Sequence, residues 1–134
     1  GIDGIVGDCG GAMSCATCAE LVARCFAART AAHFLHLKST SYAQHVALDE
    51  FYTSLVDKVD AYAECCMGVE GIFKQFPDVP VPMKLDPLDL ATDLHDWVTK
   101  HRTACACGNT ELANLVDEIL AVIDRAYYKL KFLK

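Results

Sequence analysis

The sequence AAHFLHLKSTSYAQHVALDEFYTSLVDKVDAYAE, residues 31–64, spans two helical patterns joined by a short break. Apolar positions recur at helical spacing from about residue 15 to residue 37, and again from about residue 42 to residue 67, where Gly68 follows. The Ser and Thr residues of the break at 38–41 suit a helix cap, as does Ser14 before the first helix. Two long helices joined so closely are expected to lie antiparallel and side by side.

Imidazole and carboxylate side chains recur along the second of these helices. At 100° per residue, His45, Asp49, Asp60 and Glu64 fall within roughly 100° of one face. His45 and Asp60 are nevertheless about 22 Å apart along the axis, too far to share a ligand within one chain. The pairs His45/Glu64 and Asp49/Asp60 have one common midpoint. A second copy crossing antiparallel at that point would bring His45 and Asp49 opposite the Asp60 and Glu64 of its partner, which predicts two shared sites per dimer.

The midpoint lies between Ser54 and Leu55. His33, near the end of the first helix, is a fifth candidate ligand beside these four residues. Imidazole together with carboxylate is a ligand set that iron(II), manganese(II) and zinc(II) all accept. Two ions held a few ångströms apart by shared carboxylates suit electron removal by oxygen or peroxide. We therefore expect a dinuclear iron site, with zinc or manganese as alternatives.

The rest of the chain predicts two more helices. Prolines at 77, 80, 82 and 87 exclude a long helix after residue 68. A third helix is expected from Pro87, capped by Asp86, to about Ala104, and a fourth from about Thr110 to Phe132. The predicted fold is all-α: an antiparallel four-helix bundle with a long crossover between its second and third helices. The predicted division is a Gly-rich N-terminal tail at 1–12 and one bundle domain at 13–134.

Composition limits the functions that are open to this chain. An apolar share of 53% is high for a chain with 22% charged residues, and a surface buried between subunits would account for it. No uncharged stretch reaches the roughly 18 residues of a membrane span, and the first residues lack the basic start of a signal peptide. The expectation is a cytoplasmic protein without membrane contact. A net charge of −6 argues against tight binding to nucleic-acid phosphates.

At residues 31–64 the chain resembles the Dps mini-ferritins, the ferritin-like DNA-protection proteins of starved bacteria. In that family a His ends the first helix, a His and an Asp one turn later open the second, and Asp-x-x-x-Glu closes the second helix. His33, His45, Asp49, Asp60 and Glu64 match these positions in type and spacing. The last helix, GNTELANLVDEILAVIDRAYYKLKFL, also resembles that of the family. No Glu has a His three residues later, which argues against the intrasubunit centre of larger ferritins.

The resemblance implies a hollow twelve-subunit shell that oxidises iron(II), with peroxide as a favoured oxidant, and stores the mineral inside. Compact proteins of this kind also occur in phage genomes. The chain departs from the family where Phe34 replaces a common Trp, and its crossover is short and proline-rich. Residues 1–12 contain no Lys or Arg, unlike the basic tails with which many members bind DNA. DNA binding is accordingly expected to be weak.

Secondary candidates surround this set. His36 is a further ligand or the residue that orients one, and Tyr52 either supplies an electron or packs. Glu111 and Asp117 either line an ion-entry pore, as in the family, or lie on solvated helix faces. One alternative to the iron-oxidising enzyme is a structural or DNA-associated shell whose site binds zinc or manganese without turnover.

The cysteines support a third function. Eight cysteines in helical pattern are expected to be mostly reduced and buried. Cys15-x-x-Cys18 alone is a weak zinc or redox motif, and Cys105 and Cys107 are expected in an accessible loop beside Gly108. A cysteine-based redox or zinc module is therefore the other alternative.

Overall fold

The structure is a computed structural model that describes residue 9 and residues 15–134. It contains four helices and, in that part of the chain, no strand. The helices are α1 (Ala16–Lys38), α2 (Tyr42–Glu70), α3 (Pro87–Ala106) and α4 (Thr110–Phe132). The all-α prediction is confirmed, and the predicted start of α3 and both ends of α4 are correct.

Short polar side chains explain where three of the helices begin. Ser41 accepts a hydrogen bond from the backbone N–H of Gln44, Asp86 from that of Asp89, and Asn109 from that of Leu112. Pro87 occupies the first turn of α3, where no backbone N–H is needed. The helix starts are therefore encoded locally.

Two helix ends differ from the prediction. α1 is capped by Cys15, whose sulfur accepts from the N–H of Cys18, whereas the predicted cap, Ser14, lies outside the described residues. α2 continues through Gly68 to Glu70 and is capped by Gly71. Gly71 has φ of 98°, and its N–H donates a hydrogen bond to the carbonyl of Met67. A helix tolerates an interior glycine at modest cost, but a left-handed end favours one.

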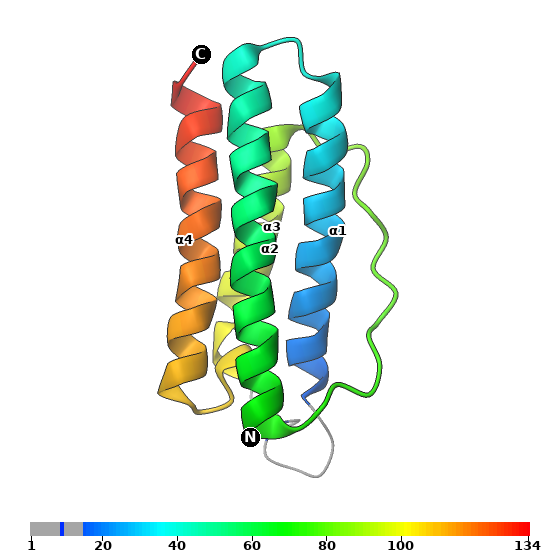
Figure 1. Ribbon diagram of the computed structural model, residues 1–134, viewed down its shortest axis with the longest axis vertical. Coiled ribbons are helices and arrows are strands. Elements are labelled where there is room, and N and C mark those ends of the chain that lie inside the picture. Colours follow the sequence, from blue (N-terminus) through cyan, green and yellow to red (C-terminus); the bar gives the residue numbers. More distant parts are fainter. Residues whose placement is uncertain (1–8, 10–14) are drawn as a thin grey trace.

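The four helices form a ring in which α1 packs on α2, α2 on α4, α4 on α3 and α3 on α1. Each neighbouring pair is antiparallel, whereas α2 and α3 run in the same direction (Figure 1). The segment between them, 71–86, therefore returns along the full length of the bundle beside α1 (Figure 1). This is the long crossover that the proline spacing predicted.

The core consists of large apolar side chains from all four helices. The fully buried members include Leu21 of α1, Leu55 of α2, Val98 of α3 and Ile119 of α4. Tyr62 is the largest of them, and its hydroxyl donates a 2.7 Å hydrogen bond to the carbonyl of Cys105. Burial of a polar hydroxyl needs such a partner. Of the described helices, none has a stretch both apolar and long enough for a membrane crossing.

Candidate functional site

The predicted ligands of the second helix lie on one unbroken helix. α2 extends without interruption from Tyr42 to Glu70, so His45, Asp49, Asp60 and Glu64 keep the spacing on which the shared-site argument depends. The three carboxylates are exposed and His45 is partly buried. The helical part of the prediction is thereby confirmed.

His36 of α1 and His45 of α2 are linked by two reciprocal hydrogen bonds, each from a ring to the other residue's backbone carbonyl. Nδ1 of His36 lies 2.7 Å from the carbonyl oxygen of His45, and Nδ1 of His45 lies 2.8 Å from the carbonyl oxygen of His36. The two rings stack with centroids 3.7 Å apart. Because a carbonyl only accepts, each Nδ1 carries the proton and each Nε2 keeps its lone pair in the neutral ring. That arrangement is typical of histidines that bind metals through Nε2.

His33 lies next to this pair, against Tyr52. The His33 and Tyr52 rings stack at 4.4 Å, and the guanidinium of Arg29 lies 5.3 Å from the centre of the Tyr52 ring. Removal from water raises the pKa of the Tyr52 phenol, and its hydrogen bond with the Asp49 side chain raises it further. These contacts favour the packing role for Tyr52 and an orienting role for His36.

A single chain does not gather the five predicted residues around one point. Among the described residues, the cluster of side chains arranged to hold a metal ion consists of cysteines. This is compatible with a site whose halves come from two chains, because Asp60 and Glu64 lie about four and five turns along α2 from His45. The five-residue assignment therefore stays a prediction about a dimer.

The cysteine cluster lies at the opposite end of α1. Its members are Cys9, Cys15, Cys18 and Cys107, and their sulfur atoms all lie within 4.8 Å of one another. Disulfides join Cys9 to Cys107 and Cys15 to Cys18. Between the two bonds, the sulfurs of Cys18 and Cys107 are 3.5 Å apart and those of Cys9 and Cys15 are 3.7 Å apart.

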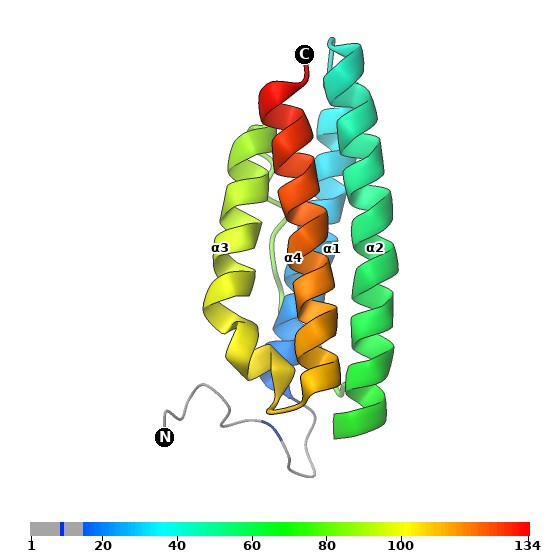
Figure 2. The ribbon, with the colours of Figure 1, turned by 90° about the vertical axis from the view of Figure 1, so that its left-hand side faces the viewer.

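Three elements bring these sulfurs together. Cys15 and Cys18 occupy the cap and first turn of α1, while Cys107 is the left-handed residue that ends α3, with φ of 52°. Cys9 belongs to the segment that precedes α1, and Figure 2 shows the start of α1 and the end of α3 at the same end of the bundle. The predicted tail at residues 1–12 otherwise lies outside the described residues.

Two sequence-based expectations about the cysteines were wrong. Four of the eight are paired in disulfides instead of being reduced. Cys105 lies inside α3 and is fully buried, with its sulfur 3.7 Å from the carbonyl of Thr17, so it is not an accessible loop residue. The sequence signal for the cluster was the combination of a CxxC motif with Cys-Gly at the end of a distant helix, but Cys9 had no motif to mark it.

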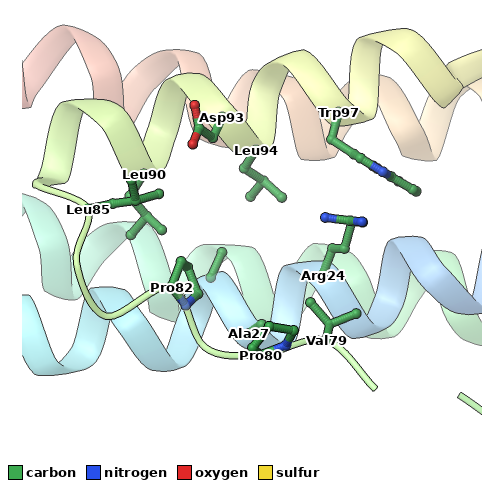
Figure 3. A pocket seen from close by; sticks show the side chains of 11 residues that line it. Arg24, Ala27, Val79, Pro80, Pro82, Leu85, Leu90, Asp93, Leu94 and Trp97 are labelled. Carbon is green, nitrogen blue, oxygen red and sulfur yellow. The ribbon is translucent and has the colours of Figure 1, made fainter. Parts of the chain in front are cut away.

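Other candidate features are structural. A pocket of about 120 Å³ lies where the crossover covers α1 and α3 (Figure 3). Its lining is mainly apolar, and Arg24 extends across it toward the ring of Trp97, 5.0 Å away (Figure 3). Asp117, an acidic pore candidate, forms a two-point ion pair with Arg102 at 2.6 and 2.8 Å. Lys129, in the last turn of α4, pairs with Glu50 of α2.

Searches among curated proteins and among solved structures find no match to this chain. One family model, described as a family of unknown function (DUF5856), matches residues 36–130. The matched region covers most of the bundle and includes both symmetric pairs of α2, whereas His33 and three cysteines of the cluster precede it. The chain belongs to this family of unknown function.

Proposed function

We propose that the protein oxidises iron(II) at two sites shared across a two-fold dimer, as the Dps mini-ferritins do. The observation that carries the proposal is the unbroken α2, which keeps His45, Asp49, Asp60 and Glu64 symmetric about one point on one side of the helix. In each site, His33, His45 and Asp49 would come from one chain. Asp60 and Glu64 would come from its partner.

The outer surface of the α1–α2 pair has the character of a subunit interface. Phe26 and Leu37 of α1 are 42% and 68% exposed and share their helix face with His33, while Val46 of α2 is 40% exposed. Apolar side chains gathered around polar ligands are typical of surfaces that become buried on association. This fits the high apolar share of the sequence.

The proposed two-fold axis meets α2 at small side chains. Thr53 and Val56 are also symmetric about the midpoint, and Thr53 is exposed while Val56 is half-buried. Short side chains at a crossing allow two helices to approach closely. An antiparallel second copy of α2 therefore finds no bulky side chain at the point where it would cross.

The donor set suits iron(II) as the substrate. Two imidazoles and three carboxylates supply nitrogen and oxygen ligands with a net negative charge, which favours the ferric product over the ferrous substrate. With a peroxide as oxidant, two iron(II) ions each give up one electron. One peroxide and two protons are then converted to two waters. The backbone carbonyls that hold His36 and His45 would keep each Nε2 directed outward without reorganisation.

The first test is the rate of iron oxidation. Iron(II) is added anaerobically to the protein, peroxide or oxygen follows, and the ultraviolet ferric band is recorded against buffer. Wild-type protein should exceed the buffer rate, and His45→Ala/Asp60→Ala should reduce the rate to that of buffer. Asp96→Ala, which removes an exposed carboxylate from α3, is the matched control and should leave the rate unchanged.

Mixing two inactive variants tests whether the site is shared. The variants are His33→Ala/His45→Ala and Asp60→Ala/Glu64→Ala, each defective in one half of the site. After unfolding and refolding together, random pairing should restore about a quarter of the wild-type sites, because each mixed dimer regains one of its two. A mixture without activity would contradict the shared site. Tight zinc or manganese binding without iron oxidation would instead identify the non-catalytic shell protein.

A further inference from the structure

The four-cysteine cluster at the lower end of the bundle is unrelated to the symmetric ligands of α2. Cys15 and Cys18 are fully buried, whereas Cys9 and Cys107 are half-buried, so the cluster has a closed side and a side open to solvent. It joins residue 9 to residue 107 across 98 positions of sequence. We propose that, in the reduced chain, Cys9, Cys15, Cys18 and Cys107 bind one Zn²⁺ as a tetrathiolate, and that oxidation by a peroxide releases the ion and forms the two disulfides.

The geometry between the disulfides fits a tetrahedral metal site. A zinc–sulfur bond of about 2.3 Å places the sulfurs of a tetrahedral site about 3.8 Å apart. The contacts from Cys18 to Cys107 and from Cys9 to Cys15 already measure 3.5 and 3.7 Å. After reduction, the bonded partners need to separate by less than about 2 Å to reach the same spacing. Side-chain rotation accounts for a movement of that size.

The charges of the reduced cluster call for a cation. Four thiols held within 4.8 Å cannot all ionise unless a positive charge lies among them, because neighbouring thiolates repel. The carbonyl oxygen of Ala104 adds to that repulsion, at 3.4 Å from the sulfurs of both Cys9 and Cys107. The backbone N–H of Cys18 in the first turn of α1 offsets part of it at Cys15, 3.1 Å away. Four sulfur ligands in tetrahedral array select zinc among the common divalent ions.

Two of the four cysteines outside the cluster are chemically different from its members. Burial raises the pKa of the Cys25 thiol far above its ordinary value and that of Cys66 to about 11, which suppresses the thiolate that reacts. An oxidant should therefore act at the cluster before it acts at these two thiols. In the proposed step, four thiolates lose four electrons and form two sulfur–sulfur bonds. Two peroxide molecules take up these electrons with four protons to give four waters, and Zn²⁺ leaves.

The test does not rest on the proposed iron chemistry. Reduced full-length protein is titrated anaerobically with Co²⁺, whose sulfur-to-metal charge-transfer band reports thiolate ligands and not imidazole or carboxylate, and Zn²⁺ is then added. One Co²⁺ per chain should give the band, and Zn²⁺ should abolish it. Cys9→Ser/Cys107→Ser should lack the band, with its helix content checked by circular dichroism. Cys65→Ser, which changes another half-buried cysteine, should keep it.

A band that is absent from the wild type, persists in Cys9→Ser/Cys107→Ser, or disappears equally in Cys65→Ser would overturn the proposal. The second arm adds a peroxide to the zinc-loaded protein. It should release one Zn²⁺ for every four thiols lost and yield the Cys9–Cys107 and Cys15–Cys18 pairs in peptide mapping. Thiol loss without zinc release, or pairing with Cys65, would also overturn it.

Discussion

The outer surface of α1 and α2 and the cysteine cluster below it are built in opposite ways. The proposed ligands on the surface belong to two helices that are adjacent in sequence, and their spacing follows from helical geometry alone. The cluster draws on three elements separated by up to 98 positions, and only the folded bundle brings them together. Residues that share one face of a regular helix can therefore be recognised from their spacing in the sequence. Residues that meet where several helix ends pack together cannot.

The cluster should contribute most to stability. Cys9→Ser/Cys107→Ser removes a cross-link over 98 positions, and the restriction that such a link places on the unfolded chain is worth about 4 kcal/mol. Urea unfolding of the oxidised protein measures this loss against wild type. The difference should become small when both proteins are reduced and free of metal. An equal loss in Cys65→Ser would show that the bond is not its source.

The outer surface should instead govern assembly. Thr53→Arg places two long side chains, one from each copy, against one another at the proposed crossing point, and overpacking of this kind costs about 1–3 kcal/mol. Sedimentation velocity should report loss of the dimer, and iron oxidation should be lost with it. Asp96→Arg, on the exposed side of α3, is the matched control and should change neither. A dimer that dissociates but still oxidises iron would break the link between assembly and site.

Tyr62 connects the two regions through the core. Its hydroxyl donates a hydrogen bond to the carbonyl of Cys105, and Cys105 lies two residues before Cys107, a member of the cluster. Tyr62→Phe leaves that buried carbonyl without this donor and should lower the free energy of unfolding by about 1 kcal/mol. Chemical denaturation measures the loss, and the Co²⁺ band should persist. An unchanged stability would mean that water replaces the hydroxyl.

The ion pair between Arg102 and Asp117 should have the smallest effect. Hydrogen bonding to the guanidinium holds the pKa of the Asp117 carboxyl below its ordinary value, so the pair stabilises the fold at neutral pH and loses this contribution as the pH falls. Both side chains are largely exposed, which limits the contribution to about 0.5 kcal/mol. Asp117→Asn should be less stable than wild type at pH 7, and the difference should vanish as the pH falls through the lowered pKa of Asp117. A pH-independent difference would exclude the ion pair as its cause.

The amino-acid pattern was enough for most of the fold. Ser41, Asp86 and Asn109 cap α2, α3 and α4 through local hydrogen bonds. The first residue of each of these three helices was predicted correctly. The errors occurred at Gly68, where α2 continues for two more residues to Glu70, and at Ser14, where Cys15 provides the cap instead. A glycine inside a helix costs only about 1 kcal/mol, so a glycine alone does not mark where a helix ends.

The sequence by itself determined an all-α bundle with a long crossover and the symmetric spacing of imidazole and carboxylate side chains along α2, because helical periodicity, capping and proline spacing are local properties. The tertiary structure alone decided that His36 and His45 orient one another and that Cys9, Cys15, Cys18 and Cys107 meet. Those contacts depend on how helix ends pack across the chain. The periodicity of a sequence does not determine the spatial distance between residues that lie far apart along the chain.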